Sequence, residues 1–175
     1  MSYTAPARLE LIALSSLPLV GAGDALAPLL LGAMQREGVS LQAGDVVVLA
    51  QKIVSKAEGR RVALDGITPS RRARALAQRT GKDPRVIELI LRESNEVLRV
   101  GREVLIVEQR SGFVLANAGI DQSNVNESGQ DTHALLLPLD ADASAAKLRA
   151  PAPISNATLR RRTSWLSFGS AMSVA

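Results

Sequence analysis

Residues 83–116, DPRVIELILRESNEVLRVGREVLIVEQRSGFVLA, contain the clearest structural signals of the chain. Asp83 is a good helix N-cap and Pro84 suits a first helical position, so a helix begins here. Three strands are predicted after it, at Val97–Val100, Val104–Glu108 and Phe113–Ala116, with a hairpin at 109–112. Because helices and strands follow each other without strict βαβ alternation, the pattern predicts an α+β fold with a mixed β-sheet and packed helices.

Further helices are predicted on both sides of this stretch. Thr68 and Pro69 begin one that runs to Gly81, and its arginine-rich face is typical of a solvated surface. Asp24 is the expected N-cap of an earlier helix that ends at Gly38. A short last helix is predicted at Asp140–Arg149.

Apolar runs predict three more strands. Arg8–Leu14 alternates loosely, and Val46–Ala50 is apolar on both faces, as expected for a buried central strand. Leu135–Leu137 is a third, buried candidate. The polar and basic stretch 51–61 is predicted to be a loop that leaves the central strand.

The composition is that of one globular domain without disulfides. Of 175 residues, 46% are hydrophobic and only 2% aromatic, so the core is aliphatic and base stacking on aromatic side chains is disfavoured. There is no cysteine, which excludes zinc–thiolate sites and cysteine nucleophiles. The apolar run Ala25–Met34 is shorter than the roughly 20 residues of a membrane span. Residues 11–23 lack the basic leader of a signal peptide, so we expect a cytoplasmic protein.

The basic excess lies at one end of the chain. Residues 150–175 contain no Asp or Glu but include Arg160, Arg161 and Arg162. Without these three arginines, 18 basic residues stand against 17 acidic ones, which argues against a general nucleic-acid surface. We predict a domain at 1–149, followed at 150–175 by a linker and a disordered tail. Binding of the three arginines to nucleic acid or to an acidic surface is a weaker alternative.

Two polar stretches that follow apolar runs are candidate sites. The first contains Lys52 and Lys56, which suit phosphate binding, although residue types alone favour a solvated loop whose Lys and Glu side chains pair. The second, 117–125, places Asp121 beside Ser and Asn residues, as at a hard-cation site. An Asx-turn in which Asp121 and Asn124 bond only local backbone is the alternative. The single histidine, His133, is interpreted as structural.

Three motifs in order give a resemblance to a known family. AQKIVSKAEGR at 50–60, NAGIDQSNV at 117–125 and LLLPLDADASA at 135–145 resemble the coenzyme F(420)-0:γ-glutamyl ligase family. Leu17–Val20, the pair Glu93 and Ser94, and residues 147–149 fit the same pattern, so the resemblance covers about residues 8–149. It implies an intertwined, dimeric mixed fold.

The resemblance also implies a reaction and its site. Such a ligase uses GTP to convert the carboxylate of F(420)-0 into an acyl phosphate, which the amine of L-glutamate attacks to form an amide. The family works with Mg²⁺ or Mn²⁺, with K⁺ as an accessory ion. GTP contacts carry over to Leu17, Pro18, Leu19, Val20, Gln51, Lys52, Lys56 and Asn124, and the divalent metal carries over to Asp121.

The sequence departs from the family pattern after Arg149. The Asp-Thr or Asp-Ser pair and the Gly-Arg-Pro-Trp-Arg-like motif expected there are absent, and residues 150–175 offer no carboxylate side chain for a second metal. We therefore expect either a frameshifted or truncated ending or an unrelated extension. The alternative to an active ligase is an inactive remnant that only binds a nucleotide or a partner.

Overall fold

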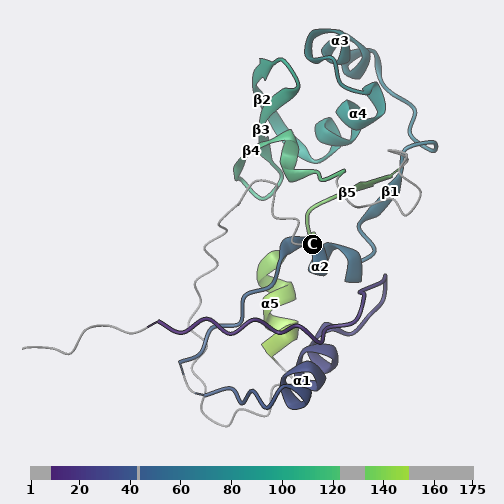
Figure 1. Ribbon diagram of the computed structural model, residues 1–175. Coiled ribbons are helices and arrows are strands. Elements are labelled where there is room, and N and C mark those ends of the chain that lie inside the picture. The colour runs from purple at the N-terminus through teal and green to yellow at the C-terminus, as the bar shows by residue number, and fades with distance from the viewer. Residues whose placement is uncertain (1–8, 43, 123–132, 150–175) are drawn as a thin grey trace, which may run out of the picture.

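The computed structural model describes residues 9–42, 44–122 and 133–149 and confirms the α+β class. Figure 1 shows two groups of helices with small sheets between and beside them. Helices α3 (Arg71–Thr80) and α4 (Pro84–Arg92) lie at the top of this view, beside a three-stranded sheet. Helices α1 (Leu26–Arg36), α2 (Gln51–Ala57) and α5 (Ala141–Arg149) form the lower half.

The upper half contains the main hydrophobic core, and its helices begin and end close to where the sequence predicts. Ser70 Oγ accepts a hydrogen bond from the Ala73 N–H at 3.1 Å, and α3 ends at Gly81 in the left-handed conformation. Asp83 caps α4 as expected. The apolar faces of both helices meet the sheet in one cluster, whose fully buried large members include Leu64, Ile87, Ile90, Leu105 and Val107.

The three-stranded sheet is antiparallel and contains the hairpin predicted at 109–112. Its strands β2 (Ser94–Gly101), β3 (Val104–Gln109) and β4 (Val114–Ala116) lie in the order β2-β3-β4. The β3–β4 hairpin turns at Gly112, whose φ of 84° and N–H bond of 2.7 Å to the Gln109 carbonyl explain why glycine stands there.

A second, two-stranded sheet joins the two halves. Strand β1 (Arg61–Ala63) pairs antiparallel with β5 (His133–Leu135), with Arg61 opposite Leu135. On its other edge β5 meets Asp121, which exchanges two backbone hydrogen bonds with Leu135 at 3.0 and 2.8 Å. This sheet therefore brings the predicted phosphate and metal segments to neighbouring positions.

Two predicted strands and one predicted loop are wrong. Residues 9–14 and 46–50 run extended but join no strand ladder among the described residues, and most of their side chains are exposed. An apolar run predicts burial only where another element covers it, and no described element covers these two. Residues 51–57 form α2 instead of a loop, because two helical turns are too short to show a clear apolar period.

The start of α1 differs from the prediction by one residue. Ala25 is the N-cap, and the Asp24 carboxylate instead accepts the Gly21 N–H at 2.7 Å, closing the turn before the helix. In the part of the chain that the structure describes, no helix is long and apolar enough to cross a membrane. The predicted tail at 150–175 lies outside the described residues.

Candidate phosphate and metal site

Helix α2 positions the basic residues of the first motif. Ala50 is extended and Gln51 begins the helix, so Lys52 and Lys56 stand four residues apart on one face. Val54 and Ser55 are buried, and Val54, two residues from each lysine, lies on the opposite side of the helix. Both lysines are half-buried.

The structure brings Lys52 and Asp121 together. The Lys52 Nζ lies 2.7 Å from the Asp121 Oδ2, and the two side chains are 30% and 26% exposed. This contact joins the first and second motifs across 69 positions of sequence, so Asp121 does not bond local backbone only. At a partly open position, the ammonium can bind a phosphate in place of the carboxylate, and the carboxylate can bind a metal ion in place of the ammonium.

A left-handed turn places Asp121. Asn117, Ala118 and Gly119 have φ values of 52°, 54° and 69°, which non-glycine residues rarely adopt. The Asn117 Oδ1 accepts the Leu105 N–H at 3.0 Å and so attaches the turn to the core strand β3. A Cβ on Gly119 would lie 2.8 Å from the Leu137 Cδ1, so the turn packs closely on the segment after β5.

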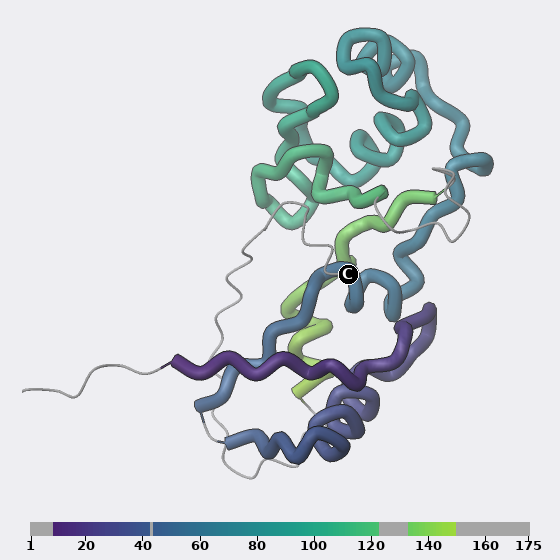
Figure 2. Tube along the Cα trace, viewed as in Figure 1, coloured from purple at the N-terminus to yellow at the C-terminus, as the bar shows by residue number. Residues whose placement is uncertain are grey.

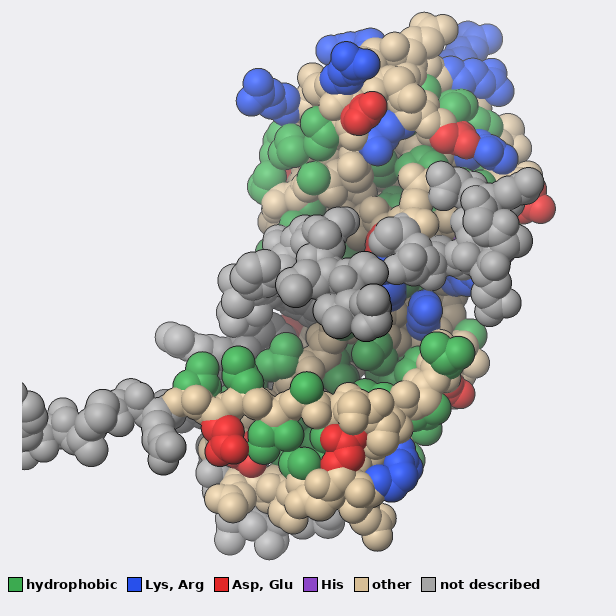
Figure 3. Space-filling model, in the orientation of Figure 1, with side chains coloured by type: hydrophobic (Ala, Val, Ile, Leu, Met, Phe, Trp, Pro, Cys, Tyr) green, Lys and Arg blue, Asp and Glu red, His purple; other side chains and the backbone are tan. Residues whose placement is uncertain are grey.

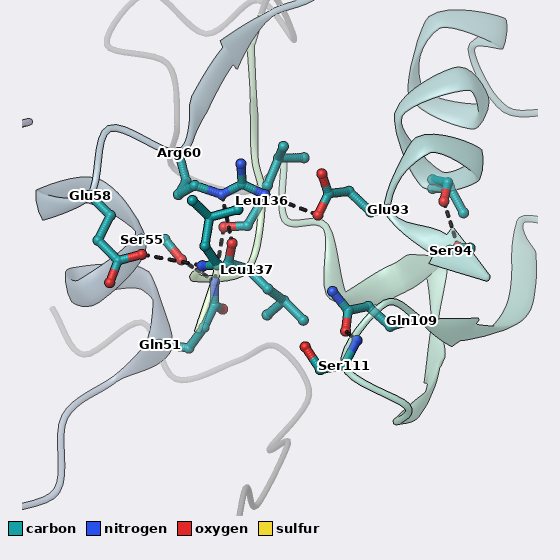
Figure 4. A network of polar contacts seen from close by, with 12 residues as sticks. Gln51, Ser55, Glu58, Arg60, Glu93, Ser94, Gln109, Ser111, Leu136 and Leu137 are labelled. Carbon is teal, nitrogen blue, oxygen red and sulfur yellow. Dashed lines mark hydrogen bonds and ion pairs between the residues drawn. The ribbon is translucent and has the colours of Figure 1, made fainter. Parts of the chain in front are cut away.

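A polar network connects α2 and the segment after β5 to the end of α4. Arg60 is its centre: Nε donates to the Leu137 carbonyl at 2.8 Å, and Nη2 lies 2.9 Å from the Glu93 Oε2 (Figure 4). The Arg60 and Glu93 side chains are only 16% and 13% exposed. Because Glu93 ends α4, this ion pair connects the α2–β1 segment to the upper core.

Gln51 and Glu58 extend the same network at the two ends of α2. The Gln51 Nε2 donates to the Ser55 Oγ at 2.7 Å, within the helix. The Glu58 carboxylate accepts hydrogen bonds from the Ser144 hydroxyl and, at 3.3 Å, from the Leu139 N–H. Helix α5 is thereby attached to the C-terminal end of α2.

Leu17–Val20 is connected to the Lys52–Asp121 pair only indirectly, through helix α2. The turn that follows it is bound to α2, since the Gly23 N–H donates to the Ala57 carbonyl at 2.9 Å. Pro18 and Leu19 are exposed, whereas Leu17 and Val20 are half-buried. The segment is therefore connected to α2 through residues 21–24. Asn124, the remaining predicted nucleotide contact, lies outside the described residues.

The donor set suits a metal ion that is shared with a ligand. Within 9–42, 44–122 and 133–149, no three His, Cys, Asp or Glu side chains gather to form a complete metal site. Asp121 supplies one carboxylate at a partly exposed position. Mg²⁺ is commonly held by one or two carboxylates together with phosphate and water oxygens, so Asp121 fits this limited role.

Four residues that organise the site carry no sequence signal for that role. Arg60 stands in a segment predicted to be a loop, and Glu93 enters only through the family resemblance, although their ion pair connects two parts of the fold. Asn117 and Gly119 stand in a polar stretch whose candidate site residues are Asp121 and Asn124. The one local signal was the Asn-Ala-Gly order, because Asn and Gly are the residues that most readily adopt positive φ.

The family model described as F(420)-0:gamma-glutamyl ligase matches residues 15–158. The chain is 49% identical over 140 residues to the coenzyme F(420):L-glutamate ligase of Methanothermobacter thermautotrophicus, covering 80% of this chain and 54% of that relative. It is 48% identical over 127 residues to the ligase of the same name from Methanopyrus kandleri, covering 73% and 47%. For the Archaeoglobus fulgidus protein of that name, the identity is 42% over 142 residues, with 81% and 53% covered.

The fold and the site define a mixed α+β domain with a candidate phosphate- and metal-binding pair between a helix and a sheet. The chain belongs to the F(420)-0:gamma-glutamyl ligase family. It spans about half the length of the curated relatives it matches.

Proposed function

We propose that this chain supplies the nucleotide-binding part of a GTP-dependent ligase that joins L-glutamate to F(420)-0 through an amide bond. The observation that carries the proposal is the Lys52–Asp121 contact of 2.7 Å. This contact brings the motifs at 50–60 and 117–125 together at one partly exposed position, with Lys52 on α2 and Asp121 paired with β5.

The proposed reaction has two steps. The terminal carboxylate of F(420)-0 attacks the γ-phosphorus of GTP, which gives an acyl phosphate and releases GDP. The amine of L-glutamate then attacks the acyl carbon, forms the amide, loses a proton and expels inorganic phosphate. The first step is needed because a carboxylate oxygen is a poor leaving group, whereas phosphate is a good one.

The chain's own residues would bind and orient the nucleotide. Lys52 and Lys56 would contact its phosphates, because they share one face of α2. Gln51 would contribute a polar contact at the start of that helix, while Leu17, Pro18, Leu19 and Val20 would contact the nucleotide through their backbone. Asn124 is proposed as a further contact on the basis of the family motif.

Asp121 is the proposed ligand of Mg²⁺ or Mn²⁺, which neutralises phosphate charge when bound. K⁺ as an accessory ion, a homodimeric assembly and a cytoplasmic location are further parts of the proposal that rest on the family resemblance. Mass measurement by light scattering tests the dimer, and a mass of one chain refutes it.

Calorimetry with GTP and Mg²⁺ tests the site. Lys52→Ala should weaken binding by about 10- to 100-fold, since a charge-assisted contact contributes roughly 1.5–3 kcal/mol. Lys82→Ala, at the distant turn between α3 and α4, is the matched lysine control and should bind like the wild type. Equal affinities for the two variants would refute the assignment of Lys52.

A nucleotide-binding domain without turnover is the second candidate. An assay that follows glutamate addition to F(420)-0 separates the two candidates. Amide formation by the chain alone supports the ligase. GTP binding without amide formation supports the second candidate.

A further inference from the structure

The chain that leads into the proposed nucleotide segment Leu17–Val20 is bound to the end of α1. Figure 2 shows it crossing the lower half as a nearly straight tube before the chain turns back into that helix. The Ser16 N–H donates to the Glu37 Oε1 at 2.7 Å, and the Arg36 Nη2 donates to the Ser16 carbonyl at 2.8 Å. The Ser15 hydroxyl makes a longer bond, of 3.5 Å, to the same carboxylate oxygen. Side chains at the end of α1 therefore hold both backbone groups of Ser16.

The other end of the segment is attached to α2. The Gly23 N–H donates to the Ala57 carbonyl at 2.9 Å, and the Gly21 N–H donates to the Asp24 Oδ2 at 2.7 Å. Between these two attachments, in the part of the chain that the structure describes, no hydrogen bond involves the backbone of Leu17–Val20. A segment that is fixed at both ends and keeps unused N–H and carbonyl groups is suited to bind a ligand through its backbone at a low cost in ordering.

Glu37 stands where a carboxylate is unfavourable for its own helix. It is the C-cap of α1, and the C-terminal end of a helix carries partial negative charge. Figure 3 shows acidic side chains among the hydrophobic ones across the lower half, so negative charge alone distinguishes no residue there. What distinguishes Glu37 is its bond to the chain that leads into Leu17–Val20. A residue that breaks a local rule of helix stability and orders a distant segment is typical of a functional position.

We propose that Glu37 and Arg36 are positioning residues that hold Leu17–Val20 in the conformation that binds the nucleotide. This inference rests on the proposed function and adds two residues that lie outside the motifs at 50–60, 117–125 and 135–145. Both residues act through the backbone of Ser16 and need not touch the nucleotide. Without them the nucleotide itself has to order the segment, and the cost of that ordering lowers its affinity.

Calorimetry with GTP and Mg²⁺ tests Glu37 through two substitutions of the same residue. Glu37→Leu removes the acceptor of the Ser16 N–H and should weaken binding about 3- to 10-fold, as expected for one hydrogen bond. Glu37→Gln keeps an oxygen that can accept this bond and should recover most of the affinity. Because both variants remove the negative charge, the difference between them reports the bond to Ser16. Equal affinities of the two variants overturn the assignment of Glu37.

Arg36 is tested in the same assay. Arg36→Met keeps an apolar side chain but removes the donor to the Ser16 carbonyl, and should weaken binding about 2- to 10-fold. The matched control is Arg71→Met, at an exposed arginine of α3 in the upper half, which should bind like the wild type. Equal affinities of Arg36→Met and Arg71→Met overturn the assignment of Arg36.

Amide exchange of the protein without nucleotide tests the positioning itself. The Ser16 N–H should exchange faster in Glu37→Leu than in Glu37→Gln, whereas circular dichroism should show the wild-type fold for both, because Glu37 is a half-buried residue at a helix end. Equal exchange in the two variants overturns the proposal. If the wild type does not bind GTP, the proposed function fails and this inference fails with it. If the wild type binds GTP and Glu37→Leu binds it equally well, only this inference fails.

Discussion

Gly119→Ala would show how far the close packing of the left-handed turn stabilises the domain. At Gly119 the backbone φ is 69°, where an alanine costs about 1–2 kcal/mol relative to glycine. The added Cβ would also lie 2.8 Å from the Leu137 Cδ1 and 3.0 Å from its Cγ. Moving that side chain costs about 1–3 kcal/mol more, so we expect a total loss of about 2–5 kcal/mol.

Gly112→Ala is the matched control for the backbone term. Its φ of 84° is similarly positive, but a Cβ there meets no atom within 4 Å. Urea unfolding should therefore show Gly112→Ala about 1–3 kcal/mol more stable than Gly119→Ala, with equal m-values. Leu137→Ala in the Gly119→Ala background should recover part of this difference, because it removes the atoms that clash. Equal stabilities of the two glycine variants would refute the packing argument.

The remaining predictions concern two ion pairs and one hydrogen bond to a carboxylate. Arg60→Met should cost about 2–4 kcal/mol in urea unfolding, because it leaves the largely buried Glu93 carboxylate unpaired. Arg60→Met/Glu93→Leu should recover much of that loss, and no recovery would contradict a role for the pair. Lys52→Ala should change stability by less than about 1 kcal/mol, since its ion pair is partly exposed; a larger loss would show that the lysine is needed for folding. The hydrogen bond from the Ser70 N–H lowers the pKa of the Glu88 carboxyl in the folded protein below its ordinary 4.5. The stability that the ionised carboxylate contributes is therefore present above pH 4.5 and is lost as the pH falls through the pKa of Glu88 in the folded state. Thermal unfolding of Glu88→Gln should therefore depend less on pH in that acid range than the wild type does, and an unchanged dependence would contradict the assignment.

The helices and the hairpin of the upper half could be predicted because their signals are local. Asp83 and Pro84 define the start of α4, and Gly81 ends α3 through its own backbone freedom. Gly112 does the same for the β3–β4 turn. Each of these features depends on a few neighbouring residues, so it can be recognised without knowledge of the rest of the fold.

The sequence motifs propose the residues of the candidate site but not their arrangement. Lys52 and Asp121 were both selected from their motifs, yet their 2.7 Å contact depends on the pairing of β5 with both β1 and Asp121. The Arg60–Glu93 ion pair likewise joins elements that are distant in sequence. Such contacts arise from packing, which local composition does not determine.

The sequence by itself determined the α+β class, the local helix and hairpin signals, and the family motifs. Only the tertiary structure decided that the apolar runs at 9–14 and 46–50 stay exposed, because hydrophobicity predicts burial but cannot say whether a covering element is present. It also decided that Asn117 and Ala118 adopt left-handed conformations, since their strain is tolerated only where the Leu105 hydrogen bond to Asn117 and the packing of Gly119 on Leu137 hold the turn.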